Sequence, residues 1–148
     1  MTTVVDVASY ILLRKKQLTT MVLQKLCYYA QAAYLVKYSK PLFDEDFEAW
    51  RNGSVCCELF KLHRGKFFIY YEDLPIKRTG KDFTAKQLAV IDAVIDEYGD
   101  KTGQELSKKT HSETPWLNGR KGLDPFDFGD NVITKQQMRE YYSKNPII

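Results

Sequence analysis

The sequence is poor in the residue patterns that bind metals or support catalysis. It has only two histidines and three cysteines. No cysteine pair has Cys-x-x-Cys spacing and no histidine pair has His-x-x-x-His spacing, which excludes the common zinc motifs. The acidic run at 44–46 lacks the alternating ligands and the glycine of a calcium loop, and no glycine-rich stretch leads into the Lys-Ser/Thr of a phosphate-binding loop. We therefore expect no metal and no cofactor.

The chain also lacks a long uninterrupted hydrophobic run. Its most apolar stretch, residues 23–50, is interrupted by Gln24, Lys25, Gln31 and Lys37, whereas a membrane-spanning helix needs about 20 mostly apolar residues. The first residues show no signal-peptide pattern of a charged and then an apolar region. An odd number of cysteines without paired spacing favours reduced thiols. These features predict a cytoplasmic protein that does not enter a membrane.

A strong excess of positive charge is missing too. Lysine and arginine number 22 against 19 acidic residues, a net charge of +3, and the pI is about 8.6. Nucleic-acid-binding domains usually have a basic stripe or a pI above about 9. The one short basic cluster, residues 14–16, lies where a helix end favours cations, and no helix-turn-helix with a basic recognition helix is evident. We therefore do not expect nucleic acid as the main partner.

What the chain does have is enough apolar material for one core. Hydrophobic residues make up 44% and aromatic residues 14% of its 148 residues, a composition and length that fit one domain spanning 1–148. The helical stretch from Leu23 to Tyr38 is too apolar to lie on the surface. We expect a mainly α fold (α+β with a minor β-hairpin), in the form of a compact helical bundle around a central hydrophobic helix at about 19–38.

Capping patterns mark where the helices begin. Apolar residues at helical spacing within 4–12 predict a first helix that ends near Lys16. Thr19 is placed to cap the central helix, which Pro41 would stop. Three later helices are each expected to begin with a capping box, a threonine followed three residues later by Gln or Glu. These boxes are Thr84–Gln87, Thr102–Glu105 and Thr134–Gln137.

Strand and turn signals are fewer. Residues 42–43 and 47–51 flank the acidic run, so we expect a small hairpin there. The remaining expectations are a short helix capped by Ser54 and running through Leu62, a strand at 67–71, a helical turn with Thr114 as its N-cap, and a loop at 118–131.

Two short segments contain candidate binding residues. Arg51 and Asn52 follow a tryptophan at the end of an expected strand, and aromatic residues and arginine are common hot-spot types in protein interfaces. His111 and Glu113 lie in a polar turn at 110–116. Our hypothesis is that these four residues share one face and contact a protein partner, with Arg51 making a charge-assisted hydrogen bond. The alternative is that His111 and Glu113 only tie their own turn to the core.

Catalysis has little support in the sequence. Either histidine could meet a cysteine, and Cys56 and Cys57 follow a turn near a helix N-terminus, where a thiolate would be stabilised. Cys27 lies in the most apolar helix and is expected to be inert. Because no set of nucleophile, base and orienting group is evident, we expect no catalytic residue. A small hydrolase or transferase, suggested only by His111 near Glu113, remains the weakest alternative.

Several short motifs occur in an order that resembles one family, the Panacea antitoxin domain, which includes the SocA antitoxin. The likeness extends over roughly residues 4–120, although residues 63–84 match nothing in it. The matching residues are Leu-Gln-Lys-Leu at 23–26, Tyr-Tyr-Ala-Gln at 28–31, Pro-Leu-Phe-Asp-Glu at 41–45, Glu-Ala-Trp at 48–50, Gly-Ser-Val at 53–55, Glu-Leu-Phe at 58–60, Tyr-Gly at 98–99, and Leu106 with Thr-His-Ser-Glu-Thr-Pro-Trp at 110–116.

This resemblance implies a cytoplasmic, often phage-associated antitoxin of a type II toxin–antitoxin pair, encoded beside its toxin and neutralising that protein by direct binding. The chain looks like a standalone member of the family. Two alternatives remain: an adaptor that delivers the toxin to a protease, and a DNA-binding regulator of its own operon. Toxins paired with the family are chemically diverse, so the resemblance names no particular toxin and leaves homo-oligomer formation open.

Overall fold

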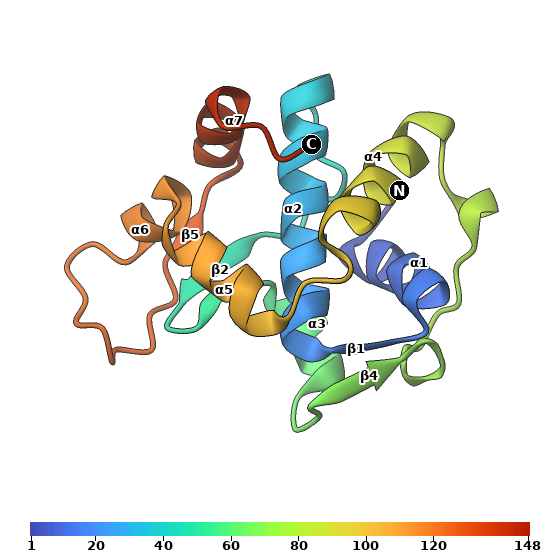
Figure 1. The fold of residues 1–148 in the computed structure, drawn as a ribbon, viewed down its shortest axis with the longest axis horizontal. Coiled ribbons are helices and arrows are strands. Elements are labelled where there is room, and N and C mark those ends of the chain that lie inside the picture. Colours follow the sequence, from blue (N-terminus) through green and yellow to red (C-terminus); the bar gives the residue numbers. More distant parts are fainter.

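Helix α2 (Thr20–Tyr38) runs through the middle of the molecule, and the other elements gather around it (Figure 1). The computed structural model describes all 148 residues. Thirteen of the nineteen residues of α2 are buried, as expected for a helix that is apolar on every side. The prediction of a mainly α fold around a central helix at about 19–38 is confirmed.

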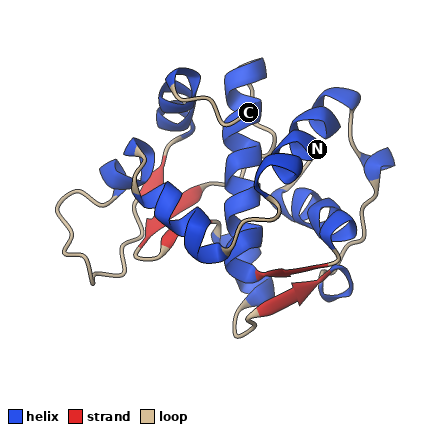
Figure 2. Cartoon of the chain, in the orientation of Figure 1, coloured by secondary structure: helices blue, strands red, loops and turns tan.

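Helices dominate the chain, and strands occupy two small regions (Figure 2). Two short 3-10 helices, η1 (Tyr71–Asp73) and η2 (Gly80–Asp82), lie between residues 70 and 85. The remaining helices are α1 (Val4–Lys15), α3 (Cys57–His63), α4 (Ala85–Tyr98), α5 (Gly103–His111), α6 (Thr114–Gly119) and α7 (Lys135–Lys144). The strands are β1 (Gln17–Thr19), β2 (Phe47–Trp50), β3 (Gly53–Val55), β4 (Phe68–Tyr70) and β5 (Val132–Ile133).

Threonine caps begin the helices as the capping patterns predict. All three predicted boxes form both of their hydrogen bonds, at Thr84, Thr102 and Thr134. Thr19 caps α2, and its Oγ1 accepts from the amide of Val22 at 3.2 Å. Because each cap is made by side chains within one turn of the chain, the sequence alone locates these helix starts.

The hairpin lies one segment later than predicted. Strands β2 and β3 pair across the turn at 51–52, with Trp50 opposite Gly53, whereas residues 42–43 form no strand. Ser54 consequently lies in β3 and caps no helix. The physical reason is that the two-residue turn at 51–52 is followed by a glycine that can adopt a positive φ, whereas the acidic run at 44–46 contains no glycine. Gly53 takes φ of +133°, a value that side-chain-bearing residues rarely adopt.

Buried amides of α2 hold the neighbouring loops in place of sheet hydrogen bonds. Gln31 Nε2 donates to the carbonyl of Phe43 at 2.6 Å, and its Oε1 accepts from the amide of Leu42 at 2.7 Å. Gln24 holds Cys56 in the same way, with Oε1 accepting from the amide at 2.8 Å and Nε2 donating to the carbonyl at 3.2 Å. Each glutamine thus fastens a loop to α2 and satisfies its own buried polar atoms.

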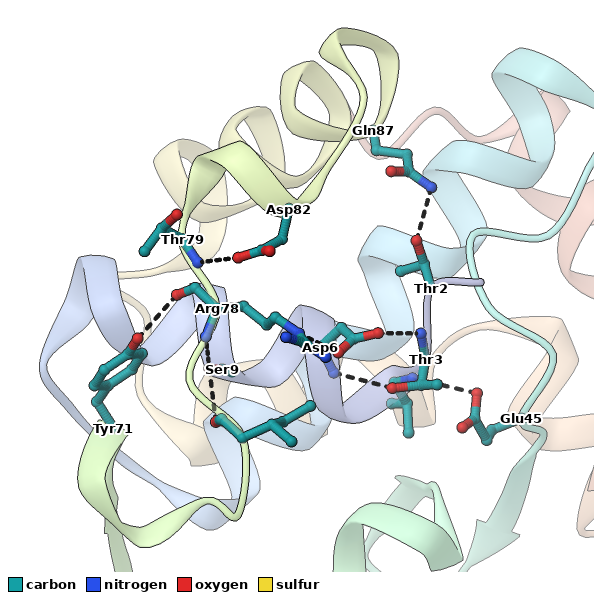
Figure 3. A network of polar contacts seen from close by, with 12 residues as sticks. Thr2, Thr3, Asp6, Ser9, Glu45, Tyr71, Arg78, Thr79, Asp82 and Gln87 are labelled. Carbon is teal, nitrogen blue, oxygen red and sulfur yellow. Dashed lines mark hydrogen bonds and ion pairs between the residues drawn. The ribbon is translucent and has the colours of Figure 1, made fainter.

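The segment 63–84, which matches nothing in the family pattern, covers α1 (Figure 3). Arg78 Nε lies 2.7 Å from Asp6 Oδ1, and the Arg78 amide donates to Ser9 Oγ at 2.8 Å. The hydroxyl of Tyr71 donates to the Arg78 carbonyl at 3.0 Å. Burial raises the pKa of Asp6, but the hydrogen bonds from Arg78 and Thr3 and the charge of Arg78 together outweigh it and hold that pKa below its ordinary value. The segment therefore fastens the first helix to the domain.

The region after α5 departs from prediction in two places. Thr114 is the first residue of α6 rather than its N-cap, a position that Glu113 occupies. The expected loop at 118–131 is shorter at its start, because α6 runs to Gly119, and it leads into β5, which adds a third strand beside β2. A Cβ on Gly119 would lie 2.5 Å from the Cβ of Ala49, so only glycine lets α6 pack this closely on β2.

Candidate partner-binding surface

Two of the four predicted binding residues, Asn52 and His111, line the same groove. The groove has a volume of about 770 Å³ and lies between the start of α2, the β2–β3 turn, the residue preceding β4, and α5. The side chains that matter for its chemistry are Met21, Asn52, Phe67, Ser107, Lys108 and His111. The structure therefore brings together residues that are 59 positions apart in the sequence.

Hydrogen bonds and ring stacking fix the position of this pair. Ser107 Oγ donates to the carbonyl of Asn52 at 3.0 Å and lies 3.4 Å from His111 Nε2, which joins the hairpin turn to α5. The His111 ring stacks on Trp116, with centroids 4.0 Å apart and an angle of 15° between the planes. Burial lowers the pKa of His111 below its ordinary value, and the charge of Lys25 lowers it further. The imidazole is thus neutral at pH 7.

Arg51 is exposed and belongs to an adjoining surface. Its Nη1 donates to the carbonyl of Phe126 at 3.1 Å, and its amide donates to the carbonyl of Phe128 at 2.9 Å. The side chains of these two phenylalanines are 84% and 54% exposed, so the loop places apolar surface beside the guanidinium. Because Arg51 and Asn52 form one turn, this apolar surface and the groove meet at the β2–β3 turn.

Glu113 does not lie on the surface, and that part of the hypothesis is wrong. Its side chain is buried, and Oε1 accepts from the hydroxyls of Tyr29 at 2.6 Å and Tyr142 at 2.8 Å. Its Oε2 accepts from Lys109 Nζ at 2.7 Å. The turn before α6 faces α2 and α7, so the carboxylate meets donors from both helices. The alternative interpretation, in which the turn is tied to the core, is correct for Glu113.

Sequence reasoning missed the buried lysine behind the groove. The Lys25 side chain is enclosed within the domain, and its Nζ donates to the carbonyl of Ser54 at 3.1 Å, with no carboxylate as a partner. Burial lowers the pKa of Lys25 to about 8 from its ordinary value of 10.5. The available signal is a lysine in the middle of a helix that is otherwise expected to be buried.

The thiols are placed as structural groups. Burial raises the pKa of Cys27 well above its ordinary value, that of Cys56 to about 12 and that of Cys57 to about 11. The three thiols are therefore protonated at pH 7. The Cys56 thiol donates to Glu58, and His63 Nε2 lies 3.0 Å from the Gln24 amide. No histidine nitrogen meets a thiol, so none of the three cysteines has an adjacent base.

No three His, Cys, Asp or Glu side chains gather in an arrangement that could hold a metal ion. No helix combines the length and the apolar character that crossing a bilayer requires.

The comparisons with known proteins point to one family. The family model described as "Antitoxin SocA-like, Panacea domain" matches residues 23–117, which is more than half of the chain. No curated protein and no solved structure is similar enough to the chain to count as a match. The matched region runs from the start of the Leu-Gln-Lys-Leu motif in α2 to α6. It includes the groove residues of the β2–β3 turn and of α5, whereas Met21 at the start of α2 lies just before it. The chain belongs to the SocA-like antitoxin family with a Panacea domain.

Proposed function

We propose that this protein is the antitoxin of a type II toxin–antitoxin pair and that it neutralises a protein toxin by direct binding. The observation that carries the proposal is the match of residues 23–117 to the SocA-like antitoxin family. The toxin would be encoded beside the antitoxin, as in phage-associated operons, and the two proteins would meet in the cytoplasm.

The surface around the β2–β3 turn supports a protein partner. Phe67 on one side of the turn and Phe126 on the other are 69% and 84% exposed, and exposed aromatic side chains close to arginine are typical of interface hot spots. Arg51, Asn52 and His111 lie between or beside these aromatic residues. We propose that these three residues contact the toxin, with Glu113 acting indirectly by holding the turn at 110–114 against the core.

Co-expression tests the proposal. Bacterial cells would express the reading frame adjacent to this gene, with and without this protein, and growth would be followed. We expect growth arrest from the neighbour alone and rescue by the wild-type chain. Arg51→Ala should weaken rescue while its melting temperature stays within about 2 °C of wild type. The control Arg139→Ala removes another exposed arginine, on α7, and should rescue fully.

The abundance of the toxin in rescued cells distinguishes neutralisation from protease delivery. Direct binding leaves the amount of toxin unchanged or higher, whereas an adaptor makes it fall in a way that depends on a cellular protease. Rescue that requires loss of the toxin would overturn the binding mechanism and favour the adaptor alternative. No arrest by the neighbour, or arrest that the wild-type chain never relieves, would refute the antitoxin proposal.

A further inference from the structure

The groove that contains Asn52 and His111 carries an unbalanced charge. None of its lining residues is an aspartate or a glutamate, whereas Lys108 of α5 is exposed at its edge. Glu105, the acidic residue of α5, accepts from the amide of Thr102 at 2.9 Å within the capping box and does not line the groove. A carboxylate entering the groove would therefore meet a cation and hydrogen-bond donors but no like charge.

A second cation, the buried ammonium of Lys25, lies close to the groove. The position that a Cβ of Gly53 would occupy lies 2.7 Å from Lys25 Nζ and 3.9 Å from His111 Nε2. The buried ammonium and the groove imidazole thus both lie close to the side of Gly53 that a side chain would occupy. Lys25 has a single carbonyl as its acceptor and no anionic partner, so its field is not cancelled locally and extends into the groove through protein rather than through water.

The opposite side of the groove is apolar and held in place. Phe67 and Met21 are 69% and 37% exposed there. The carbonyl of Phe67 accepts from the amide of Thr20 at 3.0 Å, which anchors this residue to the start of α2. An occupant with both a carboxylate and an adjacent apolar side chain would use both sides of the groove, whereas a bare inorganic anion would leave the apolar side empty.

We propose that this groove binds an acidic segment of the protein partner, with an Asp or Glu carboxylate facing Lys108 and Asn52 and a neighbouring aromatic or aliphatic side chain against Phe67 and Met21. Charge complementarity with Lys108 selects the segment, and the buried charge of Lys25 strengthens the attraction for its carboxylate. The inference deepens the proposed function, since it names the part of the toxin that the antitoxin recognises.

The test uses a phage-displayed library of random peptides selected on the immobilised wild-type protein. We expect the selected peptides to be enriched in Asp or Glu next to Phe, Tyr, Trp or Leu. Their affinity should fall about tenfold in Lys108→Glu and should weaken as salt rises. Lys144→Glu makes the same charge change at the end of α7, outside the groove, and should change affinity by less than about twofold.

Nuclear magnetic resonance spectra of the labelled protein then locate the bound peptide. Shifts should centre on Met21, Asn52 and His111, and inorganic phosphate should not displace the peptide at matched ionic strength. Selected peptides without acidic residues, binding that survives Lys108→Glu, or displacement by phosphate alone would each overturn the inference. The proposed function can fail independently of this inference. In that case the wild-type chain would bind acidic peptides but would not rescue cells from the neighbouring reading frame.

Discussion

Replacing Lys25 with methionine should change how the stability of the protein depends on pH. Methionine has a similar length and no charge, so it fills the same space without a buried ammonium. The pKa of Lys25 is about 8 in the folded state against an ordinary value of 10.5. Between these values the unfolded chain holds a proton that the folded chain lacks, so this group makes the wild type more stable as pH rises from 8 to 10.5. Below pH 8 the full cost of burying the charged ammonium lowers the stability of the wild type.

The magnitude follows from that difference in pKa. It corresponds to about 3 kcal/mol of unfolding free energy. The wild type gains this stability as the pH rises from 8 to 10.5, whereas the methionine variant has no group there to titrate and gains nothing. Losing the Lys25 donor also leaves the Ser54 carbonyl without its partner, at a cost of about 1–3 kcal/mol. Lys25→Met should therefore equal or exceed wild-type stability at pH 7 and fall below it near pH 10.

Urea unfolding of both proteins at pH 7 and pH 10 measures the effect. The thiols and tyrosines with raised pKa values in the folded state also begin to lose protons toward pH 10 in the unfolded chain, but this effect is common to both proteins and cancels in the difference. Lys37→Met makes the same change on an exposed turn of α2 and should show no such pH dependence relative to wild type. A stability difference between Lys25→Met and wild type that stays constant from pH 7 to pH 10 would refute the assignment of a buried, depressed-pKa lysine.

Three other substitutions test contacts between α2 or β2 and the segments packed against them. Glu113→Gln should lower the free energy of unfolding by about 2–4 kcal/mol, because one carboxylate accepts from two tyrosines and a lysine; an unchanged melting temperature would show that this network is not structural. Gly119→Ala should cost about 1–3 kcal/mol, because its Cβ would lie 2.5 Å from that of Ala49, and circular dichroism melting would reveal the loss. Gln31→Leu should cost about 2–4 kcal/mol, since two backbone groups of the 42–43 loop lose their partner; a urea midpoint equal to that of wild type would argue against this anchoring role.

The features that the sequence predicts well are those made within a few residues. The boxes at Thr84, Thr102 and Thr134 each depend on bonds inside one turn, and all three form. The central helix was evident because apolar residues surround its whole circumference. Family membership likewise came from ordered short motifs, and the match to residues 23–117 confirms it.

The features that the sequence did not predict depend on pairing over long distances. Strand β5 joins β2 from more than 80 residues away. Its two residues are β-branched and favour a strand, but a run of two is too short to predict one. The 42–43 loop lost its expected strand because Gln31 of α2 satisfies its backbone instead. Glu113 was placed on the surface because its turn is polar, whereas its burial depends on tyrosines from α2 and α7.

The measurement that tests the central claim most directly is isothermal titration of this protein with the purified product of the neighbouring reading frame, made non-toxic by mutation. Our account predicts a defined complex with a Kd of about 100 nM or tighter, and weaker binding for Arg51→Ala but not for Arg139→Ala. A neighbouring protein that arrests growth, is relieved by this chain in cells, and yet shows no binding heat and no co-elution with it would contradict neutralisation by direct contact.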